Sequence, residues 1–204
     1  MLDTVPYSCV YLYLISSCIS CPTTNSLPPS PIPLNPPQPQ VYPTSNAMFT
    51  TPRLTLRAFR DGDDENMLSI TNNASAAPFI TVDYVVPRGP KQKQVIAEMA
   101  ANSMMFCIIE ERLPEDSTNP GTQQNITAAS PKFIGAVAFM NKPDARNRRG
   151  EFGISMLPEF WGKGYGEEAS RFMIGYGFRQ LGLHRVSLGV FEWNTRAVEL
   201  YKRL

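Results

Sequence analysis

Hydrophobic and polar positions follow two periods along the second half of the chain. Alternation with a period of two, typical of a half-buried strand, begins at residues 53–60. Helical spacing of apolar residues appears at 91–102 and 164–181, and Gly182 supplies a stop signal. The remaining predicted strands are 104–111, 132–141, 150–157 and 184–191. A helix is predicted to follow the turn at 61–64 and to end near Asn72, and another is predicted at 194–204.

This order of elements predicts a mixed α/β or α+β sheet with at least one parallel crossover and flanking helices. On the helix at 91–102 we expect Val95, Ile96 and Met99 to lie on one face. The polar stretch 112–131 has no period, which indicates a long exposed hairpin loop.

The first part of the chain differs chemically from the rest. No Asp, Glu, Lys or Arg lies between Asp3 and Arg53, and residues 28–43 read PPSPIPLNPPQPQVYP. Such a sequence favours polyproline II and cannot form a core. We therefore expect residues 1–47 to be a disordered proline-rich leader and residues 48–204 to be the folded domain.

Composition narrows the function further. The chain has 204 residues, a net charge of +1, four cysteines and one histidine, His184. These values argue against a nucleic-acid binder, a disulfide scaffold and a histidine-based metal cage. No apolar run is long enough for a membrane span, and the run at 10–15 lacks a preceding positive charge. We expect a cytoplasmic monomer or homodimer without a metal.

The segment 151–168, EFGISMLPEFWGKGYGEE, carries the most informative chemistry. A strand ends before a glycine-rich turn, and that turn opens a helix. Unpaired amides at a helix start, together with the helix dipole, form a cradle for an anion such as phosphate. A Walker A loop is absent, and a dinucleotide fingerprint fails because Glu167 occupies its third glycine position.

Four segments in this order resemble the GNAT superfamily of N-acetyltransferases, in particular the branch of the ribosomal-protein N-acetyltransferases RimJ and RimL. They are TPRLTLRAF at 51–59, FIGAVAF at 133–139, GEFGISMLPEFWGKGYGEEA at 150–169 and LGLHRVSLGVFEWNTRAVELYKRL at 181–204. Gly164 and Gly166 fill the glycine positions of the acyl-CoA motif [QR]-x-x-G-x-[GA], and Trp161 replaces its first residue. Family members continue past the last helix with two more strands, so the resemblance implies a C-terminally incomplete domain.

The resemblance also implies where acetyl-CoA would lie. Strand 152–157 would splay from strand 184–191, and an amide near Ser155 would meet the oxyanion. Asn194 would hold the pantetheine arm, and Tyr201 would protonate the leaving thiolate. The pantetheine arm would pair with Ser155, Met156 and Leu157, and the pyrophosphate would lie on Gly162, Lys163, Gly164, Tyr165, Gly166 and Glu167.

The same resemblance implies an acetyl-CoA-dependent N-acetyltransferase that acts by direct attack in a ternary complex. Its acceptor would be a primary amine, either a small molecule or a protein N-terminus. Glu151 is the first candidate for the general base, while Glu192 and solvent stay open. Two other functions also stay open: a truncated acyl-CoA-binding protein or pseudoenzyme, and an interaction protein built on the proline-rich leader.

Overall fold

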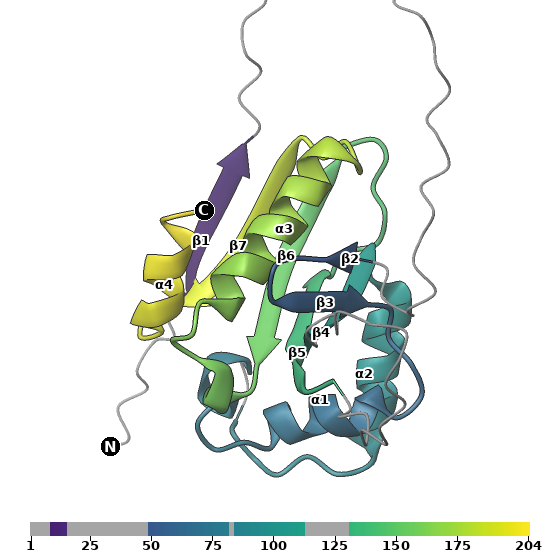
Figure 1. Ribbon diagram of the computed structural model, residues 1–204, viewed down its shortest axis with the longest axis vertical. Helices are drawn as coiled ribbons and strands as arrows, with labels where there is room; N and C mark the ends of the chain where they lie inside the picture. Colours follow the sequence, from purple (N-terminus) through teal and green to yellow (C-terminus); the bar gives the residue numbers. More distant parts are fainter. Residues whose placement is uncertain (1–8, 16–48, 82–83, 113–130) are drawn as a thin grey trace, which may run out of the picture.

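A computed structural model of the chain describes residues 9–15, 49–81, 84–112 and 131–204 (Figure 1). These residues form one seven-stranded sheet with the order β1-β7-β6-β5-β4-β3-β2. Only the β6–β7 pair is parallel, and every other neighbouring pair is antiparallel. The strands are β1 (Cys9–Ile15), β2 (Phe49–Thr50), β3 (Leu54–Arg57), β4 (Met105–Glu111), β5 (Phe133–Phe139), β6 (Arg149–Met156) and β7 (Arg185–Phe191).

Helices cover both faces of this sheet. On one face α1 (Asp63–Thr71) packs on α2 (Lys91–Asn102) and on β5. On the other face α3 (Tyr165–Arg179) makes the crossover from β6 to β7, and α4 (Thr195–Tyr201) follows β7. The mixed α/β sheet and its parallel crossover are therefore confirmed. Among the described residues, no helix is both long and apolar enough to cross a membrane.

Two short 3-10 turns connect these elements. The turn η1 (Ala77–Phe79) follows α1, and η2 (Pro158–Phe160) lies between β6 and the glycine-rich loop. Both contain a proline in their first positions, where the missing N–H is not needed.

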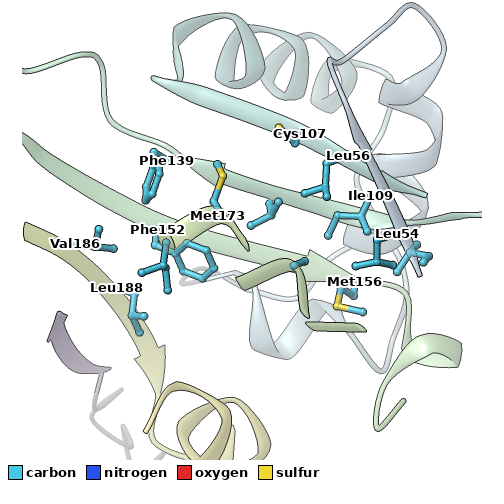
Figure 2. Close-up of a cluster of buried hydrophobic side chains, with 14 of the residues drawn as sticks. Leu54, Leu56, Cys107, Ile109, Phe139, Phe152, Met156, Met173, Val186 and Leu188 are labelled. Carbon is cyan, nitrogen blue, oxygen red and sulfur yellow. The ribbon is translucent and has the colours of Figure 1, made fainter. Parts of the chain in front are cut away.

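The main core lies between the sheet and α3. Strand alternation sends Cys107 and Ile109 of β4 toward α3, where Phe139, Phe152 and Met173 also pack (Figure 2). A second cluster on the opposite face joins α1 and α2 to Ile108 and Ala136. In β6 this alternation places Gly150, Phe152 and Met156 on the α3 side and Glu151, Gly153 and Ser155 on the α1/α2 side.

A buried ion cluster ties β3 to α1 and β4. Arg57 is 7% exposed and Asp63 is 5% exposed. Nη1 and Nη2 of Arg57 donate to the two carboxylate oxygens of Asp63 at 2.6 and 2.9 Å, and Nε donates to Glu110 at 2.8 Å. The amide of Arg60 donates to Asp63 at 2.8 Å. Both buried charges are thus paired and hydrogen-bonded, which is the condition for burying them.

The strand β1 departs from the sequence-based expectation. It lies within residues 1–47, for which the sequence predicts a disordered leader, yet it pairs antiparallel with β7 from Cys9↔Phe191 to Ile15↔Arg185. The prediction of disorder therefore does not hold for residues 9–15. The other residues of 1–47 lie outside the described residues, as does most of the hairpin loop expected at 112–131.

The apolar face predicted for α2 is buried only in part. Ile96 is 3% exposed, but Val95 is 54% and Met99 36% exposed. The helix bounds match the predicted 91–102. α2 packs against α1 and touches the sheet at β4, and Ile96 is its buried residue in the second core cluster.

Candidate active site

The glycine-rich loop leads from η2 into α3 with two residues in the left-handed region. Gly162 has φ 73° and Gly164 has φ 82°, which side chains with a Cβ rarely adopt. Within the described part of the chain, no group accepts a hydrogen bond from the amides of residues 162–167. The first return bond of the helix is from the Glu168 amide to the Gly164 carbonyl, at 3.1 Å. The predicted row of unpaired amides is present.

Two carboxylates in the first turn of α3 would repel an anion, but both are neutralised. Glu168 pairs with Arg53 at 2.7 Å, and Glu167 pairs with Arg171 at 2.9 Å and with Arg203 at 3.6 Å. The hydrogen bond from Arg171 lowers the pKa of Glu167. Burial opposes ionisation of Glu168, but bonds from Thr51 and Arg53 prevail and lower its pKa. The helix terminus therefore keeps a positive field.

The sheet opens directly beside this loop. The strands β6 and β7 pair only over residues 149–151 and 185–187. Beyond Glu151 no described residue pairs with β6 on its β7 side, while β6 stays paired with β5 as far as Met156. The predicted splay between these two parallel strands is therefore confirmed.

The hydrogen bonds to β5 decide which backbone groups of β6 face the opening. The Leu157 amide donates to the Ile134 carbonyl at 2.9 Å, and the Met140 amide donates to the Glu151 carbonyl at 2.8 Å. Backbone groups of an antiparallel strand point alternately toward its partner and away from it. The residues of β6 and its end that face β5 are therefore 151, 153, 155 and 157.

The open edge consequently consists of the Phe152 carbonyl, both backbone groups of Ile154 and the amide of Met156. The Met156 carbonyl is already bonded, because the Trp161 indole N–H donates to it at 3.0 Å. The pantetheine contact expected at Ser155–Leu157 therefore needs correction. The backbone groups of Ser155 and the Leu157 amide face β5, and the Leu157 carbonyl accepts from the Phe160 amide at 3.1 Å, so neither residue offers an amide to the opening.

Trp161 connects the loop to both faces of the molecule. Besides its bond to Met156, its ring lies edge-on to Phe79 at a centroid distance of 5.9 Å. The Arg196 guanidinium lies over the same ring at 5.0 Å. Trp161 thus fills the place of the motif's polar first residue by packing, and it brings η1 next to the end of β6.

Tyr201 lies at the closed end of the splay. Because α4 starts beyond the open end of β7 and returns, its last residue reaches Phe152, with ring centroids 6.2 Å apart and nearly perpendicular. Burial raises the pKa of Tyr201 to about 12. Among the described residues, none accepts a hydrogen bond from its hydroxyl, which leaves that group available to a ligand.

Asn194 lies at the opposite end of α4 and caps the helix. Its side-chain oxygen accepts a hydrogen bond from the Ala197 amide at 3.2 Å. Its side-chain N–H₂ donates to no group in the described part of the chain. The cap therefore leaves a donor near the open end of the splay, as a contact to a pantetheine arm requires.

The two candidate bases lie at different ends of the opening. Glu151 is the last residue of β6 that pairs with β7, and its side chain is on the α1/α2 face, opposite Tyr201. Its amide is held by the Asn141 side-chain oxygen at 2.6 Å. Glu192 directly follows β7 at the wide end of the splay. The structure thus brings Glu151, and not Glu192, to the end where Tyr201 lies.

The sequence alone does not identify the residues before β3 that contact the glycine-rich loop and the start of α3. The sequence pattern identifies Arg53 and Thr51 only as the start of a strand, yet both bind Glu168, and Arg53 also binds the Lys163 carbonyl at 2.8 Å. No local pattern signals such a contact, because these residues are more than 100 positions apart in the sequence. Within the described residues, no group of three or more His, Cys, Asp or Glu could hold a metal ion.

A splayed parallel strand pair, followed by a helix start with unpaired amides, provides an anion-binding cradle beside an open strand edge. Residues 53–204 match the acetyltransferase (GNAT) domain, so the chain belongs to this family.

Several acetyltransferases are similar in sequence. The uncharacterized N-acetyltransferase p20 of Bacillus licheniformis is 35% identical over 79 residues, covering 39% of this chain and 44% of that protein. Spermidine N(1)-acetyltransferase of Escherichia coli (strain K12) is 38% identical over 58 residues, 28% of this chain and 31% of that protein. In these two alignments the chain spans less than half of either relative. The uncharacterized N-acetyltransferase YoaA of Bacillus subtilis is 26% identical over 77% of this chain and 81% of its own length.

Solved structures show the same fold. The spermidine N-acetyltransferase of Vibrio cholerae, in complex with CoA and spermine, has a TM-score of 0.57 at 23% sequence identity. This match covers 74% of the present chain and 78% of the other. An acetyltransferase of Agrobacterium tumefaciens also has a TM-score of 0.57, at 18% identity.

Proposed function

We propose that this chain is an acetyl-CoA-dependent N-acetyltransferase that transfers an acetyl group to a primary amine by direct attack. The observation that carries the proposal is the row of unpaired amides at residues 162–167, beside the open edge of β6. Such a row satisfies the oxygens of a pyrophosphate, and the neutralised acids of the first turn do not oppose it.

The open edge of β6 supports the rest of the binding mode. Backbone groups of Phe152 and Ile154 would pair with the amides of a pantetheine arm, as an added strand would. From Met156 back to Phe152 the strand rises by about 13 Å, at roughly 3.3 Å per residue. An arm that starts at the glycine-rich loop is thereby directed to Tyr201, and the Asn194 amide would contact it on the way.

The chemistry requires a proton acceptor for the amine and a proton donor for the sulfur. Acetyl-CoA supplies an activated acetyl group, whose C–S bond breaks as the amine nitrogen bonds to the carbonyl carbon. Glu151, directly or through water, would take the proton that the amine loses. Tyr201 would donate its proton to the departing sulfur and regain one from solvent, which leaves an N-acetylated amine and a CoA thiol.

A small amine is the acceptor that the relatives favour, since spermidine N-acetyltransferases are among them. The carboxylate of Glu151 is exposed on the α1/α2 face, where a cationic amine would be attracted before it loses its proton. The resemblance to the RimJ and RimL branch supports a protein N-terminus instead. We propose the small amine first and keep the N-terminal peptide as the competing acceptor.

An amine panel separates these acceptors. Purified full-length chain is mixed with acetyl-CoA and spermidine, a simple monoamine or a peptide with a free N-terminus, and released thiol is measured. Amine-dependent thiol release with spermidine supports the proposal, and release only with the peptide changes the acceptor class. Binding of acetyl-CoA without turnover on any amine would indicate an acyl-CoA-binding protein rather than an enzyme.

A further inference from the structure

We infer that Arg53 is a positioning residue that locks the peptide group between Lys163 and Gly164 in its anion-binding orientation. This inference rests on the proposed function and extends it to a residue outside the glycine-rich loop. Its basis is a set of contacts that joins the start of β3 to the start of α3.

Arg53 is held against α3 by several independent contacts. Its Nε donates to one carboxylate oxygen of Glu168 at 2.7 Å, and its backbone amide donates to the other at 2.9 Å. The Thr51 hydroxyl donates to the same carboxylate at 2.6 Å. The guanidinium also lies 4.7 Å from the centre of the Tyr165 ring, and the hydroxyl of that tyrosine donates to Glu111 at 3.0 Å.

The remaining arm of the guanidinium reaches the loop itself. Its Nη1 donates to the Lys163 carbonyl at 2.8 Å. A Cβ built on Gly164 would lie 3.1 Å from Nη2 of Arg53, so the side chain borders the loop directly. Arg53 thus occupies one side of the loop, the side to which the Lys163 carbonyl points.

Because the peptide bond is planar, this contact also fixes the direction of the Gly164 amide. In a trans peptide the carbonyl and the following N–H point in opposite directions. When Arg53 holds the Lys163 carbonyl, the Gly164 amide must therefore point away from Arg53, into the row of unpaired amides.

Without that hydrogen bond the peptide could rotate at low cost. The rotation changes ψ of Lys163 together with φ of Gly164, and glycine accepts positive and negative φ about equally. The rotated peptide would direct a carbonyl oxygen, instead of an N–H, at the phosphate oxygens. Arg53 therefore stabilises one of two accessible loop conformations, and its effect should appear in affinity for acetyl-CoA rather than in the chemical step.

The test compares the wild-type chain with Arg53→Ala, Arg53→Lys and the control Arg179→Ala. Arg179 lies in the last turn of α3, at the opposite end of the helix from the loop. The lysine variant keeps the positive charge beside Glu168, but one ammonium group cannot reproduce the two-armed contact. Calorimetry with acetyl-CoA measures Kd, and thiol release at saturating acetyl-CoA measures kcat.

We expect Kd to rise about tenfold in both Arg53 variants, with kcat within twofold of wild type and the control unchanged. Wild-type affinity in folded Arg53→Ala would overturn the inference. An Arg53→Lys Kd within threefold of wild type would also overturn it, because charge alone would then suffice. A fall in kcat at unchanged Kd would contradict the positioning role as well.

A second measurement needs no ligand and separates this inference from the proposed function. If wild type itself binds no acetyl-CoA, the proposed function fails, but the lock can still be tested by amide NMR. Rotation of the peptide in Arg53→Lys should broaden or shift the Lys163 and Gly164 amide resonances, while Arg179→Ala leaves them sharp. Unchanged resonances in Arg53→Lys would show that Arg53 does not control this peptide.

Discussion

Tyr201 combines a buried ring with a hydroxyl that no described residue binds. Because burial raises its pKa to about 12, the hydroxyl stays protonated throughout the neutral range and can donate to a leaving sulfur. We expect Tyr201→Phe to lower kcat by about 100-fold, which is the lower end of general acid–base contributions. The ring contact with Phe152 is kept, so Kd for acetyl-CoA should stay within about twofold.

The pH profile gives a second check on Tyr201. With its pKa near 12, wild-type kcat should show no alkaline decline from this residue below about pH 10. Stopped assays of thiol release from pH 7 to 10 measure this. Equal kcat values in Tyr201→Phe and wild type across that range would remove the proton-donor role.

Asp63 governs acid stability through its contact with Arg57. Burial opposes ionisation of Asp63, but hydrogen bonds from Arg57 and the Arg60 amide prevail and lower its pKa. Its contribution is therefore complete above the unfolded-state pKa, about 4, and is lost as the pH falls through the lower folded value. Asp63→Asn should lower the free energy of unfolding by about 3 kcal/mol at pH 7.

Urea unfolding at several pH values tests this sign. The difference between wild type and Asp63→Asn should shrink as the pH falls from 5 to 3, since Asp63 of the unfolded wild-type chain then binds a proton that the folded chain resists. A difference that stays constant over this interval would show that the loss at pH 7 does not come from the ion pair.

Among the secondary-structure elements, β1 extends the sheet at β7, a role that its sequence does not predict. Without β1, the strand β7 would be joined to the sheet only through residues 149–151 of β6. Removing residues 1–15 should therefore lower the free energy of unfolding by about 2–4 kcal/mol, because several backbone hydrogen bonds are lost. Urea denaturation followed by circular dichroism measures the change.

A shorter truncation provides the matched control for β1. Removing only residues 1–8 leaves the strand Cys9–Ile15 intact, so the unfolding midpoint should match wild type. If the two truncated chains unfold at the same urea concentration, pairing between β1 and β7 does not stabilise the domain.

The sequence predicts best those helices and strands in which one buried face produces a regular spacing of apolar residues. The bounds of α2 match the predicted 91–102, and β7 begins one residue after the predicted start. The pairing of β1 was missed because seven apolar residues in a charge-free segment fit many partners, and only the unpaired edge of β7 selects one. Of the apolar residues predicted to share one face of α2, only Ile96 is buried, because periodicity shows which residues align and not how closely a helix approaches its neighbours.

The candidate site likewise has one part that the sequence predicts and another that it does not. The glycine-rich loop has a local signature, so its unpaired amides could be predicted from Gly162, Gly164 and the following helix. The open edge at Phe152 and Ile154 could not, because the direction of each backbone group depends on the register with β5. Arg53 was missed for a similar reason, since its partners lie in α3 and the loop.

In the whole molecule, α3, α4 and the open edge of β6 together would bind one ligand, acetyl-CoA. A substitution at Gly164 tests this claim most directly. Its φ is 82°, and a Cβ at this position would lie 3.1 Å from Nη2 of Arg53, so a β-branched residue there would distort the cradle. Gly89 has open space around it and no such backbone constraint, so Gly89→Ala is the matched control.

Calorimetric titration of acetyl-CoA into the full-length chain decides whether this ligand binds there. We expect one-to-one binding with Kd on the order of 10 μM, at least tenfold weaker binding by folded Gly164→Val, and no change in Gly89→Ala. The proposed acetyl-CoA site would be contradicted if folded wild-type protein gave no binding heat with acetyl-CoA and CoA did not compete for the site. Equal affinity for acetyl-CoA in wild type and Gly164→Val would contradict it as well.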